Sequence, residues 1–433
     1  MKVQESMPTT KVERSAKFVK TGFQIGGNYI KHYSKKLFDP DLSRDELNED
    51  NASDIYNSLS ELKGSALKIA QMLSMDKNVL PKAYINKFTQ SQYNAPPLSG
   101  PLIIRTFTKS FGKSPDKLYD TFNLASTNAA SIGQVHEATL KGKKLAVKIQ
   151  YPGVADSISS DLKLVKPFAF RLLGMSEKEL NIYIKEVEER LLEETDYKLE
   201  VRRSIEFSEA CKNLENVVFP TYYPALSSDK IITMDWIKGL HLKEFLKTNP
   251  SQSLRNKIGQ ALWDFYNFQQ YELRAVHADP HPGNFLITPD KKLAVIDFGC
   301  IKEIPDDFYL PFFELIEPGL LDDKAATIKA FRQLGMIQPD DSAKQIEFYY
   351  KAYKQMISLF ALPYTSKTFD FSKPEFFEDL YAWGEKITKM PEFKQPRGVK
   401  HFIYINRTNF GLYTILNELG ATVKTDTYKP HLK

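Results

Sequence analysis

The stretch that decides the fold is His277-Ala278-Asp279-Pro280-His281-Pro282-Gly283-Asn284. Earlier in the chain, the string Leu145-Ala146-Val147-Lys148-Ile149 places a single lysine inside an apolar run with the composition of a β-strand. Later in the chain comes Asp297-Phe298-Gly299. Each string alone is a weak signal, because short motifs arise by chance in long chains. Their order and their internal spacing together carry the information.

This combination predicts a site that binds a nucleotide and transfers a phosphoryl group. The spacing of Asp279 and Asn284 is that of the kinase catalytic loop H-R-D-x-x-x-x-N, and Asp297 begins the metal-binding motif D-F-G. We therefore expect Asp279 to orient or deprotonate an acceptor hydroxyl. Asn284 and Asp297 are expected to bind the Mg²⁺ that bridges the phosphates.

Lys148 is expected to contact the α- and β-phosphates of the nucleotide. A lysine in that role needs a carboxylate to hold it, and the candidate is Glu200. We predict one long charged helix over residues 177–209, on which Asp196 and Glu200 share a face. For each of these acids the alternative is a solvated acidic helix face.

The loop above the phosphates departs from the glycine-rich pattern G-x-G-x-x-G-x-V. When Gly133 and Val135 are aligned with the end of that pattern, Asn128 and Ala130 stand where two glycines are usual. The segment Ala129-Ala130-Ser131 then puts Cβ atoms where phosphates approach. We expect phosphate geometry and nucleotide selectivity to differ from those of an ordinary kinase.

The strand-like run 230–234 leads into a hinge, where backbone groups are expected to contact the adenine. The residues concerned are Met234, Asp235, Trp236 and Ile237. No Ala-Pro-Glu follows the D-F-G motif, so the segment that docks protein substrates in ordinary kinases looks absent or rebuilt. A conventional protein kinase is therefore disfavoured.

Composition sets broad limits on the class of protein. The 433 residues exceed one ordinary core, and the 42% hydrophobic and 26% charged fractions are typical of a globular protein. The two cysteines, Cys211 and Cys300, argue against a disulfide framework and a cysteine-based metal site. We find no secretory signal, transit peptide or apolar run of about 18 residues, and so predict a cytoplasmic protein without a transmembrane helix.

The first 38 residues are basic, with eight lysines and arginines against Glu5 and Glu13. Such a bias can favour an anionic surface, although a solvated basic helix face is the commoner meaning. We expect peripheral contact with an anionic membrane and no nucleic-acid partner. Gly22, Gly26 and Gly27 argue against one continuous helix here. A polar connector is expected over residues 39–53, and a helix over 59–73.

The hydrophobic pattern predicts an α+β chain with a small β-rich lobe, a hinge and a helical lobe. The strands 130–140 and 144–150 are expected to form a hairpin through Lys141-Gly142-Lys143. The expected parts are a basic N-terminal segment (1–38), a helical lid subdomain (39–117), an N-lobe (118–238) and a C-lobe (239–433).

Five longer strings make the pattern more specific. They are Leu67-Lys68-Ile69-Ala70-Gln71-Met72-Leu73-Ser74, Ala129-Ala130-Ser131-Ile132-Gly133-Gln134-Val135-His136, the run 146–154, Glu194-Thr195-Asp196-Tyr197, and the run 279–284. This set resembles the UbiB family of atypical kinases, also called ABC1, AarF or ADCK proteins. The family's K-x-G-Q signature falls on Lys68 and Gln71, with Ala70 in place of glycine. Its E-x-D signature falls on Glu194 and Asp196.

The resemblance implies a protein-kinase-like two-lobe fold with an added N-terminal helical subdomain folded over the active site. Lys68 of that subdomain would form an ion pair with Glu194 and Asp196, and Gln71 would face the nucleotide. The resemblance also implies ATP or ADP with Mg²⁺, and weak or absent protein phosphorylation. It implies a supporting role in ubiquinone or other isoprenoid-lipid metabolism at a membrane, with a lipid or quinone precursor as a ligand.

The leading hypothesis is therefore an ATP-dependent atypical kinase or ATPase that acts on, or is gated by, a lipid-like small molecule. A Ser/Thr protein kinase is the alternative within enzymes. A nucleotide-binding pseudokinase that acts as a scaffold for lipid-biosynthetic enzymes is the alternative from another class.

Overall fold

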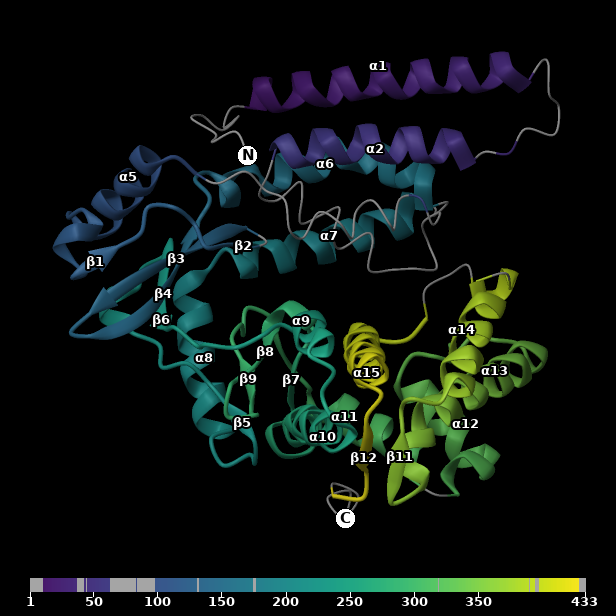
Figure 1. Ribbon diagram of the computed structural model, residues 1–433. Helices are drawn as coiled ribbons and strands as arrows, with labels where there is room; N and C mark the ends of the chain where they lie inside the picture. The colour runs from purple at the N-terminus through teal and green to yellow at the C-terminus, as the bar shows by residue number, and fades with distance from the viewer. Residues whose placement is uncertain are drawn as a thin grey trace. The chain divides into compact units, whose positions relative to one another are not determined.

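The computed structural model describes residues 11–36, 43, 45–62, 83, 98–130, 132–173, 177–317, 319–388, 390–393 and 397–427 (Figure 1). The chain forms two compact units. The first unit contains the residues up to Arg202 and the segment Thr221–Trp236. The second unit contains Arg203–Pro220 and the chain from Ile237 onward.

An antiparallel five-stranded sheet forms the centre of the first unit. Its strands are β1 (Thr121–Phe122), β2 (Asn128–Ala130), β3 (Gly133–Leu140), β4 (Lys143–Gln150) and β6 (Ile231–Asp235). The order is β1-β3-β4-β6, with β2 pairing to β3. Lys141 and Gly142 connect β3 and β4 with φ values of 51° and 75°. Two positive φ angles are typical of the tight turn that matches strand twist, so the predicted hairpin is present.

The helices of the first unit are α1 (Lys11–Lys36), α2 (Asp45–Leu62), α5 (Gly100–Phe111), α6 (Val154–Leu173) and α7 (Glu177–Glu194). The expected interruption of the first helix was wrong, because α1 continues through Gly26 and Gly27. Hydrogen bonds to α2 offset the cost of about 1 kcal/mol for each helical glycine. Asn28 Nδ2, for example, donates to Asn51 Oδ1 at 3.1 Å and to Asp54 Oδ2 at 2.8 Å.

The expected polar connector over residues 39–53 is also shorter than predicted, since α2 begins at Asp45. Asp45 and Glu46 lie in its first turn, where acidic side chains interact favourably with the helix dipole. A cluster of Asp and Asn here marks a helix start rather than a loop. None of the helices among the described residues is long and apolar enough to cross a membrane.

The single helix predicted over residues 177–209 is two helices. The first, α7, ends at Glu194, and α8 (Tyr197–Ala210) begins after a corner at Thr195-Asp196. Asp196 caps α8, because its Oδ1 accepts a hydrogen bond from the Leu199 N–H at 3.0 Å. Asp196 therefore stands before the helix and does not share a helical face with Glu200. Helix α8 contributes residues to both units.

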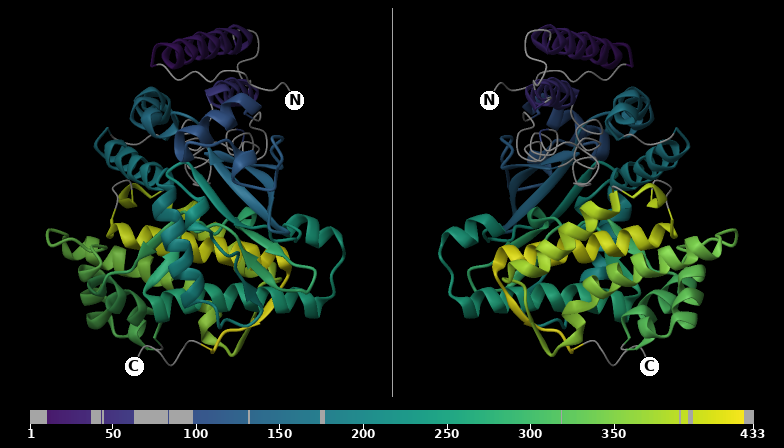
Figure 2. Two further views of the ribbon diagram at one scale, coloured as in Figure 1. Left: turned by 90° about the vertical axis from the view of Figure 1, so that its left-hand side faces the viewer. Right: turned by 90° about the vertical axis from the view of Figure 1, so that its right-hand side faces the viewer.

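The second unit is mostly helical, as expected. Its helices are α9 (Leu242–Lys247), α10 (Gln252–Phe268), α11 (Asp306–Phe313), α12 (Lys324–Gln333), α13 (Ala343–Ala361), α14 (Pro374–Thr388) and α15 (Lys400–Leu419). Its short strands are β5 (Val217–Val218), β7 (Ala275–His277), β8 (Phe285–Ile287), β9 (Leu293–Val295), β10 (Ile301–Glu303), β11 (Thr368–Asp370) and β12 (Thr422–Lys424). Figure 2 shows α15 along its length, and this helix packs against α10.

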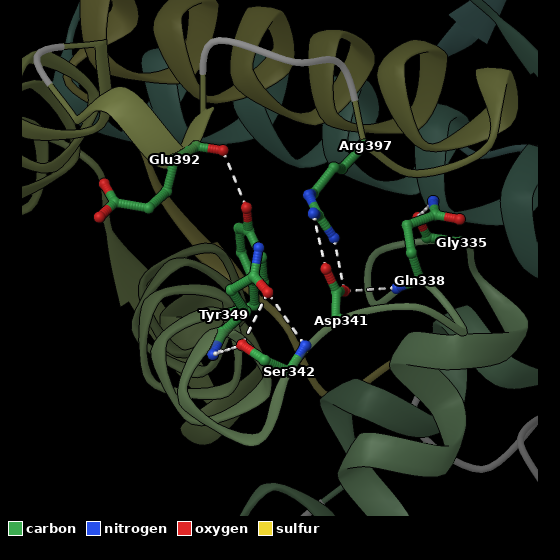
Figure 3. A network of polar contacts seen from close by, with 8 residues as sticks. Gly335, Gln338, Asp341, Ser342, Tyr349, Glu392 and Arg397 are labelled. Carbon is green, nitrogen blue, oxygen red and sulfur yellow. Dashed lines mark hydrogen bonds and ion pairs between the residues drawn. The ribbon is translucent and has the colours of Figure 1, made fainter.

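A polar network joins the residues before α15 to the start of α13 (Figure 3). The Arg397 guanidinium forms two hydrogen bonds to the Asp341 carboxylate, at 2.6 and 2.8 Å, and lies 3.8 Å from the centre of the Tyr349 ring. The Asp341 side chain is only 3% exposed. The Arg397 guanidinium beside it holds the pKa of that carboxyl below its usual range. This pair fixes the chain on both sides of α14.

We expect Asp341→Asn to lower the free energy of unfolding by about 3 kcal/mol at pH 7, because it breaks a largely buried ion pair. The lowered folded-state pKa means that the pair stabilises the fold above about pH 4 and that this contribution is lost as the pH falls further. Denaturant titrations at several pH values should therefore show a difference between wild type and variant that shrinks in acid.

The exposed Glu347, which pairs with Lys324 and Lys351, provides the control. Glu347→Gln should change stability by less than about 1 kcal/mol. Equal effects of the two substitutions would show that the Asp341 pair has no special role.

Candidate functional site

Lys148 and Glu200, which the sequence pairs, form a buried ion pair in the first unit. Lys148 Nζ lies 2.8 Å from Glu200 Oε1, and the two side chains are 11% and 7% exposed. Lys148 lies on the central strand β4, directly between Val135 on β3 and Ile232 on β6. The Tyr197 ring centre is 5.2 Å from Nζ. The Lys148 side chain is therefore largely shielded from water and held by a carboxylate.

Local sequence explains why α8 presents Glu200 to β4. The Asp196 cap starts the helix, which places Tyr197 and Glu200 in its first turn. Tyr197 is fully buried against β3, where a Cβ added to Gly133 would lie 2.9 Å from the Tyr197 hydroxyl and 2.4 Å from Ile149 O. Gly133 is therefore needed for close packing of β3, β4 and α8.

Gln150 is a residue that the sequence reasoning missed. It lies two residues after Lys148, on the same face of β4. Its Nε2 donates to Thr195 O at 2.9 Å, and its Oε1 accepts from Lys230 Nζ at 2.7 Å. This contact ties the corner between α7 and α8 to the strand that carries Lys148. The sequence signal was a polar residue two positions after Lys148, at the end of a largely apolar run.

The alanine-rich segment forms β2 and pairs with the start of β3. Asn128 lies opposite Val135, Ala129 opposite Gln134 and Ala130 opposite Gly133. Ser131 lies outside the described residues. Gln134 supports this hairpin through its Oε1, which accepts from Leu98 N at 2.8 Å.

His136 continues this support on β3. Its Nε2 lies 2.8 Å from Gln134 Nε2, and its Nδ1 lies 2.9 Å from Asn123 O. Burial lowers the pKa of His136, so the ring is neutral at pH 7. Neither Gln134 nor His136 was assigned a role from the sequence, although both stand in the quoted string.

Two backbone groups of the hinge are already used inside the first unit. Asp235 N–H donates to Thr221 O at 2.9 Å, and Trp236 N–H donates to Lys144 O at 3.1 Å. Met234 is buried in the sheet. The N–H groups of Asp235 and Trp236 are therefore already engaged, and the expected adenine contact with this segment stays a prediction.

Asp279 and Asn284 lie together in the second unit, directly after β7. Asn284 Nδ2 donates to Asp279 O at 2.9 Å and approaches Asp279 Oδ2 at 3.3 Å. His281 N–H donates to Asp279 O at 2.7 Å. These bonds close the loop on itself and fix the direction of the Asn284 amide.

The Asp297-Phe298-Gly299 turn is joined to that loop by backbone bonds. Ile296 N–H donates to Asn284 O at 3.0 Å, and Ala278 N–H donates to Cys300 O at 2.8 Å. Asp297 Oδ1 accepts from Gly299 N–H at 2.8 Å. The three predicted polar residues Asp279, Asn284 and Asp297 are thus on two loops that are bonded to each other.

Phe298 is fully buried and anchors this turn. Its ring centre lies 5.9 Å from that of Phe207 on α8, 5.8 Å from that of Phe219 and 6.0 Å from that of His277. His277 is also fully buried, and burial lowers its pKa, so it is neutral at pH 7. The histidine is therefore a packing residue of the loop.

The predicted lid ion pair falls partly outside the described residues, since Lys68 and Gln71 are not among them. Glu194 lies half-buried at the end of α7, and Asp196 is exposed at the cap of α8.

Comparisons with known proteins find relatives with a kinase-like domain. The family model of the ABC1 atypical kinase-like domain matches residues 90–331. The probable serine/threonine-protein kinase abkA of Dictyostelium discoideum is 25% identical over 99% of this chain and 80% of that protein. The mitochondrial atypical kinase COQ8 of Saccharomyces cerevisiae is 32% identical over 67% of this chain. The chain spans only 58% of the length of that yeast protein.

A solved structure is similar over most of the chain. The complex of Rv3197 with erythromycin from Mycobacterium tuberculosis superposes with a TM-score of 0.61 at 26% identity, covering 89% of this chain and 96% of that one. The family match covers more than half of the 433 residues, from 90 to 331. The chain belongs to the ABC1 family of atypical kinase-like proteins, and its fold is the kinase-like fold of that family.

Proposed function

We propose that the chain is an ATP- and Mg²⁺-dependent atypical kinase or ATPase of the UbiB type. The observation that carries the proposal is the buried Lys148–Glu200 ion pair. Burial of an ammonium group costs several kcal/mol. Buried charged groups are therefore concentrated at sites where the charge takes part in binding or catalysis. A lysine held by a helix carboxylate is the arrangement that contacts nucleotide phosphates in kinases.

The second unit supplies the donors that Mg²⁺ prefers. Asp297 offers a carboxylate and Asn284 an amide oxygen, and both ligand types suit a hard cation. Because Asn284 Nδ2 donates to Asp279, its Oδ1 is the atom that remains for a metal. The residues therefore fit Mg²⁺, which would neutralise the charge of the phosphates when bound. Asp279 would orient the acceptor hydroxyl or water.

The chain after the D-F-G turn supports an acceptor other than an ordinary protein substrate. Only β10 stands between that turn and α11, which begins at Asp306. This leaves little chain for the segment that docks peptides in protein kinases. The name of the Dictyostelium relative keeps a Ser/Thr protein kinase as the second candidate. A pseudokinase scaffold is the third candidate, which the intact Asp279 and Asp297 disfavour.

We further propose that the activity supports ubiquinone or other isoprenoid-lipid metabolism, with the protein peripheral to a membrane. The described part of α1 supports a membrane contact. Its buried face is polar, since Thr21 and His32 are buried there and Asn28 bonds to α2. Its outer face carries Phe23 and Ile30, which are 77% and 71% exposed.

The polar and apolar faces of α1 are the reverse of those of a helix on a water-exposed surface, which buries its apolar side chains. A pair of helices that buries polar groups and exposes apolar ones is suited to an apolar environment. Lys31 and Lys35 are already engaged by Glu46 and Asp50. The apolar face rather than those two lysines is therefore expected to supply the affinity, in contrast to the electrostatic contact inferred from charge alone.

The nucleotide proposal predicts that ATP with Mg²⁺ raises the melting temperature of the protein. The rise should vanish in Lys148→Ala and in Asp297→Ala, because each removes a group that holds the phosphates or their metal. Glu347→Gln should retain it. A nucleotide-dependent rise retained in both site variants would contradict the assignment.

The enzymatic proposal predicts slow phosphate release from ATP by the purified protein, measured with and without detergent-solubilised quinone precursors. Asp297→Asn should reduce the rate at least 100-fold, because it weakens metal binding at the phosphates. Stimulation by a precursor would support the lipid connection. Nucleotide binding without Asp297-dependent turnover would favour the scaffold, whereas phosphorylation of added peptides would favour the Ser/Thr kinase.

The membrane proposal predicts that Phe23→Ser/Ile30→Ser weakens binding to vesicles of phosphatidylcholine and phosphatidylglycerol more than tenfold, because two large apolar side chains no longer enter the interface. Co-sedimentation measures the effect. The control is Phe170→Ser, which removes an exposed aromatic side chain from α6 in the same unit. Equal binding of wild type and the double variant would refute the proposed face.

A further inference from the structure

The catalytic loop of the second unit packs against a glycine on the last long helix. Gly411 lies in the middle of α15, and a Cβ added there would lie 2.2 Å from Pro280 Cγ, 2.8 Å from Pro280 Cβ and 3.3 Å from Pro280 O. Real Cβ contacts are essentially never shorter than 3.0 Å. A glycine inside a helix costs about 1 kcal/mol relative to alanine, and here the close approach of Pro280 accounts for it.

A displacement of the Pro280 ring also displaces Asp279. Its ring fixes its own φ angle, and it follows Asp279 directly. The loop is also closed on itself, because Asp279 O accepts both His281 N–H and Asn284 Nδ2. A displacement of the proline ring therefore first moves the backbone that carries the Asp279 carboxylate.

Helix α15 is held at several points along its length and so cannot move away freely. Asn409 Oδ1 accepts from Gln270 Nε2 at 3.1 Å, and Tyr413 OH donates to Phe360 O at 2.9 Å. Beyond its end, Ala421 packs so closely on α10 that a Cβ added to Gly259 would lie 2.5 Å from the Ala421 Cβ.

A second connection runs from α15 to the residue that precedes the loop. Gln270 belongs to a π-helical turn, Gln269–Leu273, a form that is rare and often found at functional sites. In the same turn, Gln269 Oε1 accepts the His277 N–H at 2.7 Å. The helix thus reaches Asp279 from both sides, through Asn409 and the π-turn to His277 and through Gly411 to Pro280.

We propose that Gly411 and Asn409 are positioning residues of the phosphoryl-transfer reaction, through which α15 sets the location of Asp279. This rests on the proposed function. A Cβ at Gly411 requires a displacement of about 1 Å to restore an ordinary contact, and misplacement of a catalytic group by that distance can cost about 100-fold in rate.

The test is Gly411→Ala in the full chain, with steady-state ATP hydrolysis as the assay. We expect kcat to fall about 100-fold. The KM for ATP and the ATP-induced rise in melting temperature should change less than threefold, because neither Gly411 nor Asn409 is proposed to bind the nucleotide. Gly27→Ala is the matched control, since it also replaces a helical glycine but one with open space around its Cβ position. It should behave as wild type.

A double-mutant cycle separates positioning from lost stability. Gly411→Ala should cost much less in a Pro280→Gly background, because the ring that meets the new methyl group is gone. Equal losses in both backgrounds, or a wild-type kcat for Gly411→Ala, would overturn the proposal. If Gly411→Ala does not fold, Asn409→Ala is the second variant, because it adds no volume. It is expected to lower kcat about tenfold with the KM for ATP unchanged. A wild-type kcat for Asn409→Ala would also overturn the proposal.

A readout without activity separates this inference from the proposed function. Crystal structures of wild type and Gly411→Ala should show the Pro280 Cα displaced by about 1 Å. An unmoved loop refutes the positioning role even where no hydrolysis is found. Absence of Asp297-dependent hydrolysis in wild type, together with a displaced loop in the variant, refutes only the proposed function.

Discussion

The buried charge of Lys148 is the constraint on which the first unit depends. Glu200, whose Oε1 lies 2.8 Å from Lys148 Nζ, stabilises this ammonium group, since an unpaired ion at that depth costs several kcal/mol. Helix α8 must therefore begin at the right residue and lie close to β4. Three features place the helix there. Asp196 caps its start, Gln150 bonds to the Thr195 carbonyl, and Gly133 has no side chain to hold α8 away from the sheet.

Helix α8 also contributes a packing contact to the second unit. Three residues after Glu200, α8 passes from one unit into the other, and Phe207 in its last part packs on Phe298. One helix thus carries the ion-pair partner of Lys148 and a packing partner of the Asp297-Phe298-Gly299 turn. A shift of α8 by a single residue would break the ion pair and also remove the Phe207 contact with Phe298, so both contacts constrain the sequence of this helix.

Local strings predicted much of this arrangement because their information is local. The hairpin around Gly142 and the loops that carry Asp279 and Asp297 follow from short motifs with strong backbone preferences. The break at Thr195 was missed because aspartate is also common inside charged helices. Asp196 caps α8 through the Leu199 N–H, and Gln150 holds the preceding carbonyl of Thr195 by a tertiary hydrogen bond that no periodicity contains. The uninterrupted α1 was missed for the same reason.

The contact between Gly411 and Pro280 could not have been predicted from the sequence. The two residues are distant in the chain, and a glycine in a helix has no local signature for its neighbour. The family model ends at residue 331, yet Asn409 and Gly411 of α15 support the loop that the model contains. Part of the packing around that loop therefore comes from a helix that lies outside the matched residues. Because a proline ring and a helix backbone are both stiff, we expect this packing to set the location of Asp279, which then depends on residues outside the motif that contains it.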